Sequence, residues 1–127
     1  MARLTLMLAA AAVAAVGVLA GSAGARTSMA HPKLIGLVGK NDAFKITLKN
    51  SSGKLVKTIK KGTYTFVISD DSSIHNYELD GPHGKSWTFT SVPFTGTKKF
   101  TIALKAGKYK AYCMAHESEM FQHFTVK

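Results

Sequence analysis

The chain has 127 residues, enough for one ordinary domain and too few for two. Its formal net charge is +10, with lysines spread along the chain rather than gathered in one block. This balance favours an acidic partner surface or an anionic membrane. There is no arginine cluster, helix-turn-helix pattern or aromatic RNA motif, so nucleic acid is not an expected partner. We expect a single domain that acts as a monomer.

The N-terminus has the pattern of a secretory signal peptide. Arg3 precedes an apolar, alanine-rich run over residues 4–20, and small residues follow at 21–25. The sequence predicts a signal peptide over residues 1–25 with cleavage after Ala25, and cleavage after Ala30 is the alternative. The apolar run is shorter than the roughly 20 residues that span a bilayer, so no stable membrane insertion is expected after cleavage.

Residues 26–127 are therefore predicted to form an exported domain, periplasmic or extracellular. Exported proteins usually pair their cysteines in disulfides, but this chain has a single cysteine, Cys113. No internal disulfide is possible, and the thiol needs another explanation.

Short segments of alternating apolar and polar residues recur along this domain, with the period of two that is typical of half-buried strands. The first segments run over residues 33–38, 44–48, 55–59 and 64–68, with turn residues at 50–53 and 70–73. His75, Tyr77 and Leu79 then share one face of a further predicted strand. The remaining segments lie at 87–89, 100–104, 109–113 and 121–126. No long helical stripe follows residue 30, so we predict an all-β, antiparallel Greek-key sandwich of seven to eight strands.

The segment between the last two predicted strands carries the chemistry. Cys113, His116 and Met120 lie within eight residues, so one loop can wrap a thiol, an imidazole and a thioether around one ion. These soft donors and the imidazole select copper over the hard cations, and zinc usually has a second cysteine or a third histidine. A trigonal copper site needs one more nitrogen, for which His75 is the best candidate because it begins an inward-facing series.

Three pieces of the sequence together resemble the plastocyanin and azurin family of small blue-copper proteins, the cupredoxins. They are residues 62–66, His75-Asn76-Tyr77, and residues 106–109 leading into Cys113 and His116. The resemblance implies a cupredoxin fold with one copper per chain, held by His75, Cys113 and His116 as strong ligands and by Met120 as a weak axial one. It also implies that the amide of Asn76 ties the two ligand loops together.

The same resemblance implies a function. The copper would cycle between Cu(I) and Cu(II), His116 would be the electron port, and the partners would be redox proteins, so the chain is not expected to be an enzyme. A copper carrier or scavenger that uses the same ligands is the alternative. The loop departs from the family pattern, because three residues rather than four separate His116 from Met120. Glu117 or Glu119 therefore stays open as an alternative to Met120.

Overall fold

The computed structural model describes Gly21, Gly24 and residues 28–127. Apart from those two glycines, the predicted signal peptide and its cleavage site after Ala25 lie outside the described residues. None of the helices in this part of the chain has the length and apolar character that a membrane span requires.

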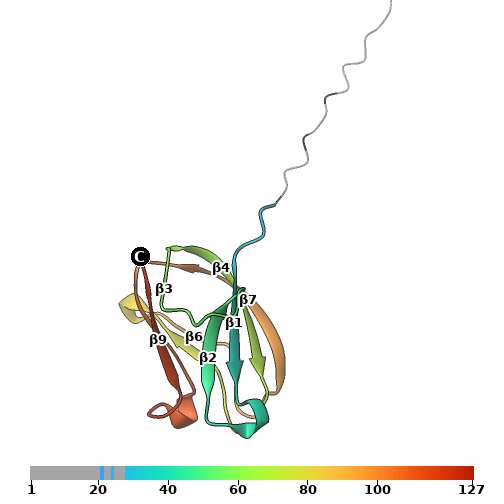
Figure 1. Cartoon of the computed structure of the whole chain (residues 1–127), viewed down its shortest axis with the longest axis vertical. Coiled ribbons are helices and arrows are strands. Elements are labelled where there is room, and N and C mark those ends of the chain that lie inside the picture. Colours follow the sequence, from blue (N-terminus) through green and yellow to red (C-terminus); the bar gives the residue numbers. More distant parts are fainter. Residues whose placement is uncertain (1–20, 22–23, 25–27) are drawn as a thin grey trace, which may run out of the picture.

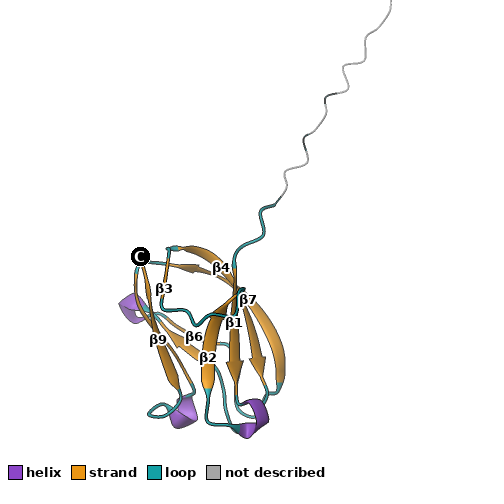
Figure 2. Ribbon diagram, in the orientation of Figure 1, coloured by secondary structure: helices purple, strands orange, loops and turns teal. Residues whose placement is uncertain are grey.

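The described residues form two β-sheets that face each other (Figures 1 and 2). One sheet has four strands in the order β2-β1-β4-β7, and the other has five in the order β3-β9-β8-β5-β6. The strands are β1 (Lys33–Val38), β2 (Ile46–Asn50), β3 (Thr58–Ile59), β4 (Gly62–Asp70), β5 (Glu78–Asp80), β6 (Ser86–Thr88), β7 (Gly96–Leu104), β8 (Gly107–Tyr112) and β9 (Phe121–Val126). Short 3-10 helices occupy Lys40–Asp42 (η1), Pro82–Gly84 (η2) and Met114–His116 (η3).

The alternation in the sequence sets which side chains fill the space between the sheets. β4 and β7 pair antiparallel over their full length, with Phe66 opposite Phe100. Phe66 and Ile68 of β4 are fully buried, while Val67 between them lies on the outer face and is only half-buried. Leu79 and Phe124 supply the core from the other sheet. The predicted all-β sandwich is confirmed, with nine strands in the described residues.

The strand directions differ from the expected all-antiparallel arrangement. β1 pairs with β4 in parallel, and β3 pairs with β9 in parallel. The reason is the path of the chain, which leaves β2, crosses to β3 in the other sheet, and returns as β4 in the same direction as β1. Both sheets are therefore mixed.

Two predicted strand starts are also corrected. His75 does not begin a strand, because β5 starts only at Glu78, and the amide of Tyr77 donates to the hydroxyl of Thr90 rather than to a neighbouring strand. Likewise β2 begins at Ile46, and Phe44 lies in the loop before it with 52% of its surface exposed. Both residues lie in loops at the same end of the sandwich.

Candidate metal centre

Three candidate ligands come from loops that the sandwich brings together at one end. His75 lies in the loop between β4 and β5, Cys113 follows the end of β8, and His116 closes η3. The turn of η3 brings Cys113 and His116 close together, because the His116 amide donates a hydrogen bond to the Cys113 carbonyl at 3.1 Å. In Figure 2, η3 and η1 lie at the same end of the molecule.

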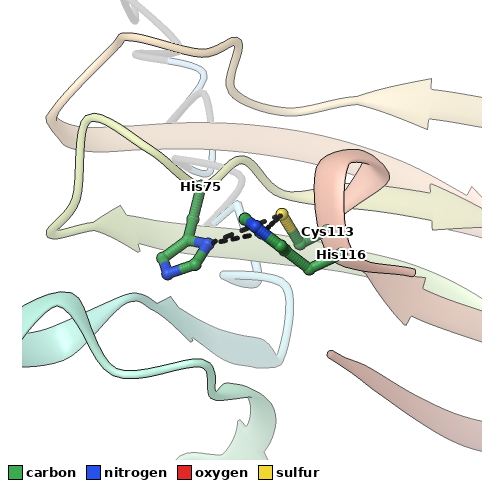
Figure 3. Close-up of side chains that lie close together, drawn as sticks. All are labelled: His75, Cys113 and His116. Atoms are coloured by element: carbon green, nitrogen blue, oxygen red, sulfur yellow. Dashed lines mark hydrogen bonds between the residues drawn. The ribbon is translucent and has the colours of Figure 1, made fainter. Parts of the chain in front are cut away.

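The donor atoms converge on one point (Figure 3). The two Nδ1 atoms of His75 and His116 are 3.0 Å apart, and the Cys113 Sγ lies 3.8 Å from the first and 3.7 Å from the second. A point about 2 Å from all three atoms lies within this triangle, close to the length of a bond from nitrogen or sulfur to a first-row transition metal. The triangle therefore has the right size for one ion.

The surroundings of His75 also fit a metal at this point. His75 and Cys113 are fully buried, and His116 is half-buried. The far nitrogen of His75, Nε2, is buried and has no hydrogen-bond partner among the described residues. Every polar contact of this ring is thus made by Nδ1, the atom that faces the thiol and the other imidazole. Two imidazole nitrogens and one thiol are a donor set that suits copper.

Met120 lies next to this triangle along the chain and in space. Its carbonyl accepts a hydrogen bond from the Cys113 amide at 3.1 Å, and its own amide donates to the His116 carbonyl at 2.9 Å. Its side chain is buried in the core. The two carboxylates that competed with it are differently placed: Glu117 forms an ion pair with Lys110 at 2.6 Å, and Glu119 is exposed. Of these three side chains, only that of Met120 is buried.

Phe44 covers the two histidines from the loop before β2. Its ring meets His75 edge-on at a centroid distance of 4.9 Å and His116 at 4.6 Å. Aromatic rings prefer such T-shaped contacts. Phe44 was not predicted as part of the site, because it lies in an alternating run that predicts a strand, and an aromatic residue in such a run carries no signal of a site.

Asn76 joins the two loops that carry the candidate ligands. Its Oδ1 accepts a hydrogen bond from the amide of Met114 at 2.8 Å, directly after Cys113. Its Nδ2 donates to Glu78 Oε1 at 2.8 Å, and the hydroxyl of Thr88 donates to the other carboxylate oxygen of Glu78 at 2.8 Å. Burial raises the pKa of Glu78, against the opposing effect of these two hydrogen bonds. No pattern in the sequence indicates this buried carboxylate.

A second buried network holds the His75 loop from behind. The Thr90 hydroxyl donates to Asp70 Oδ2 at 2.6 Å and accepts from the Tyr77 amide at 2.8 Å. Burial raises the pKa of Asp70, partly offset by its hydrogen bonds from Thr90 and Ser72. The loop that carries His75 is therefore tied at both ends to buried polar groups.

A sandwich of two mixed sheets with two histidines and a cysteine converging at one end has the cupredoxin fold. The copper protein rusticyanin matches it with a TM-score of 0.53 and 16% identity over 75% of this chain and 76% of that chain. Reduced rusticyanin matches with a TM-score of 0.52 and 16% identity over 75% and 78%, and its NMR structure with 0.50 and 18% over 75% and 76%. At this identity the likeness concerns the fold.

No protein-family model matches the sequence, and no curated protein does so. Any chemistry proposed for this end of the fold therefore rests on the residues of the chain itself.

Proposed function

We propose that the chain is an exported type 1 copper protein that shuttles single electrons between protein partners. His75, Cys113 and His116 would hold one copper ion, with Met120 as the weak axial ligand. The observation that carries the proposal is the triangle of two Nδ1 atoms and one Sγ, with sides of 3.0, 3.8 and 3.7 Å. That rusticyanin is a copper protein of the same fold supports it.

A bound copper ion supplies one-electron chemistry between Cu(I) and Cu(II). The residues of the chain supply a fixed geometry, because His75 lies in a loop held by the Thr90 network and Cys113 lies where β8 ends. Burial of His75 and Cys113 keeps water from two of the three donors. The half-buried ring of His116 leaves one short route from the centre to the surface.

The soft thioether of Met120 suits the axial position next to a thiolate and two imidazoles. Its backbone is hydrogen-bonded to both Cys113 and His116, so the loop closes around the site. Glu117 forms an ion pair with Lys110 instead. We therefore assign Met120 as the fourth ligand.

Export to the periplasm or beyond belongs to the same proposal. It is supported by the signal-peptide pattern over residues 1–25. We propose that the protein works there as a monomer.

A copper carrier that uses the same ligands is the competing function, and Met114 is the feature that favours it. This thioether follows Cys113 directly and is 61% exposed, so it offers a soft donor at the surface. The complete burial of His75 and Cys113 argues for retention of the metal instead. Retention is what an electron carrier requires.

Voltammetry and metal transfer separate the two functions. The copper-loaded protein is cycled between oxidation states on an electrode, and the reduced form is then mixed with a Cu(I) chelator. We expect a reversible one-electron wave and slow loss of copper. An absent wave with transfer of copper within the mixing time would establish the carrier function in its place.

A further inference from the structure

The outer face of the four-stranded sheet combines lysines with apolar residues. Across the sheet, Lys49 of β2, Ile35 of β1, Val67 of β4 and Lys99 of β7 form one row. Ile35 is 42% exposed at the centre of the row, with Val67 half-buried beside it. The row is therefore apolar in the middle and basic at both ends.

Further lysines extend this face along the strands. Lys33 begins β1, two residues before Ile35, and Lys45 precedes β2 on the side of Thr47 and Lys49. We call the surface formed by Lys33, Lys45, Lys49, Lys99, Ile35 and Val67 the lysine face. No carboxylate points outward from its four strands, all of which lie in the described residues: Asp70, their one acidic residue, is buried.

The other sheet carries charges of both signs, which makes this difference informative. On β5 and β8, Asp80 lies opposite Lys110 in the ladder. In the loop that follows β8, Glu117 is paired with Lys110. Positive charge without a compensating acid is thus a property of one face and not of the whole domain.

A hollow of about 210 Å³ opens at one end of the lysine face, between β1, β2 and η1. Leu37 and Thr47 line it together with Lys40, Lys45 and Lys49. Ala43 also lines it, and the next residue is Phe44, whose ring contacts His75 and His116. The hollow therefore adjoins the loop that covers the candidate metal centre.

We propose that the lysine face docks an acidic protein, so that the bound partner lies beside Phe44 and the half-buried edge of His116. This proposal rests on the proposed function, since it names the surface and the chemistry of its redox partner. An exposed apolar centre with a charged rim is the composition of a protein interface. Uncompensated lysines attract an acidic partner from a distance and orient it on this face.

An anionic membrane would also attract lysines, but the face suits it less. The two apolar residues of the central row, Ile35 and Val67, are only partly exposed and lie between lysines, so little apolar surface can enter a bilayer. A protein with carboxylates around an apolar patch complements both parts of the face. Membrane binding is therefore the outcome that the test must separate from docking.

The probe is succinylated cytochrome c, an acidic haem protein, with unmodified basic cytochrome c as its control. Binding is followed by amide shifts of the isotope-labelled protein, at low and at physiological ionic strength. We expect shifts on β1, β2 and the loop around Phe44, with affinity that falls as salt increases. The basic probe should not bind.

Charge-reversed variants locate the site. Lys49→Glu with Lys99→Glu should weaken binding of the acidic probe by about tenfold or more, whereas Lys85→Glu with Lys108→Glu, which leaves the lysine face intact, should weaken it by about twofold at most. Equal weakening by both pairs, or shifts confined to the β5–β8 side, would overturn the proposal. So would binding to vesicles of anionic phospholipid without binding to the acidic probe.

The same titration with Cys113→Ser keeps the docking proposal separate from the copper proposal. This substitution removes the thiol but no residue of the lysine face. Shifts that persist in the variant support docking whether or not the chain holds copper. Loss of the shifts in a variant that remains folded would contradict it.

Discussion

The side-chain amide of Asn76 donates a hydrogen bond to Glu78 Oε1 at 2.8 Å, and this bond turns the Asn76 carbonyl toward the amide of Met114. The orientation of Asn76 is thus set by a buried carboxylate two residues further along the chain. Because Met114 follows Cys113 directly, Glu78 acts on the ligand loop through Asn76. Groups that hold a metal ligand in this indirect way commonly change metal affinity by 10- to 100-fold when they are removed.

Replacing Glu78 tests this relationship. Glu78→Leu removes the acceptor for Asn76, so we expect copper release to a chelator to become about tenfold faster or more. Glu78→Gln keeps an oxygen that accepts from Asn76 and an amide that donates to Thr88, so its release rate should stay near that of the wild type. Similar release rates in the two variants would show that Glu78 does not position the loop.

The raised pKa of Glu78 also predicts how stability depends on pH. Burial raises this pKa in the folded state, so between the unfolded and folded pKa values the folded protein binds the proton and the unfolded chain does not. Glu78 makes its full contribution to the free energy of unfolding below about pH 4.3, the pKa of a glutamate in the unfolded chain. This contribution is lost as the pH rises through the pKa of Glu78 in the folded protein. Asp70 acts in the same direction.

The measurement is the thermal midpoint of the metal-free protein from pH 4 to neutral pH. As the pH rises, the thermal midpoint of Glu78→Gln should fall less than that of the wild type, because the variant lacks one of the two carboxyl groups whose pKa is raised. Parallel curves for the two proteins would contradict a raised pKa at Glu78.

Thr90 offers a test of the network behind His75. Thr90→Val keeps the volume of the side chain but leaves Asp70 Oδ2 and the Tyr77 amide without their partner. We expect the free energy of unfolding to fall by about 2–4 kcal/mol, because both groups are buried. Thr90→Ser retains the hydroxyl and should lose about 1 kcal/mol. Urea unfolding of the metal-free variants measures the difference, and equal losses would show that the hydroxyl is not what matters.

Phe44 tests whether the aromatic cover protects the centre. Phe44→Ala removes both edge contacts with the histidines, so we expect faster copper release and a loss of about 1 kcal/mol in unfolding free energy. Leu55→Ala is the matched control, since Leu55 is 49% exposed and Phe44 is 52% exposed. The control should change stability to a similar extent without changing copper release. An unchanged rate of copper release in Phe44→Ala would show that this ring does not protect the centre.

Much of the sandwich could be predicted because alternation reports directly on which side of a strand is buried. The alternation over residues 64–68 predicts the buried face of β4, on which Phe66 and Ile68 are fully buried. The parallel pairing of β1 with β4 could not be predicted in this way, because alternation determines the buried face of a strand but not its neighbour or its direction. Strand neighbours depend on contacts between segments that are far apart in the chain.

The same limit explains why only some residues of the site could be predicted. The spacing of Cys113 and His116 indicates one loop, and the structure places both beside His75. Glu78 alternates with Tyr77 and Leu79, a pattern that predicts an outward strand position. It is buried because Asn76 and Thr88 surround its carboxylate, and this covering depends on β6 and the ligand loop. No local pattern in the sequence contains that information.

The most direct test of the account is the visible absorption spectrum of the oxidised protein after addition of one equivalent of Cu(II), with Cys113→Ser as the control. We expect an intense thiolate-to-copper band in the wild type that is absent from the variant. Substitution of Met120 by leucine should shift the band without abolishing it. A colourless wild-type protein, or one that binds no copper, would contradict the central claim.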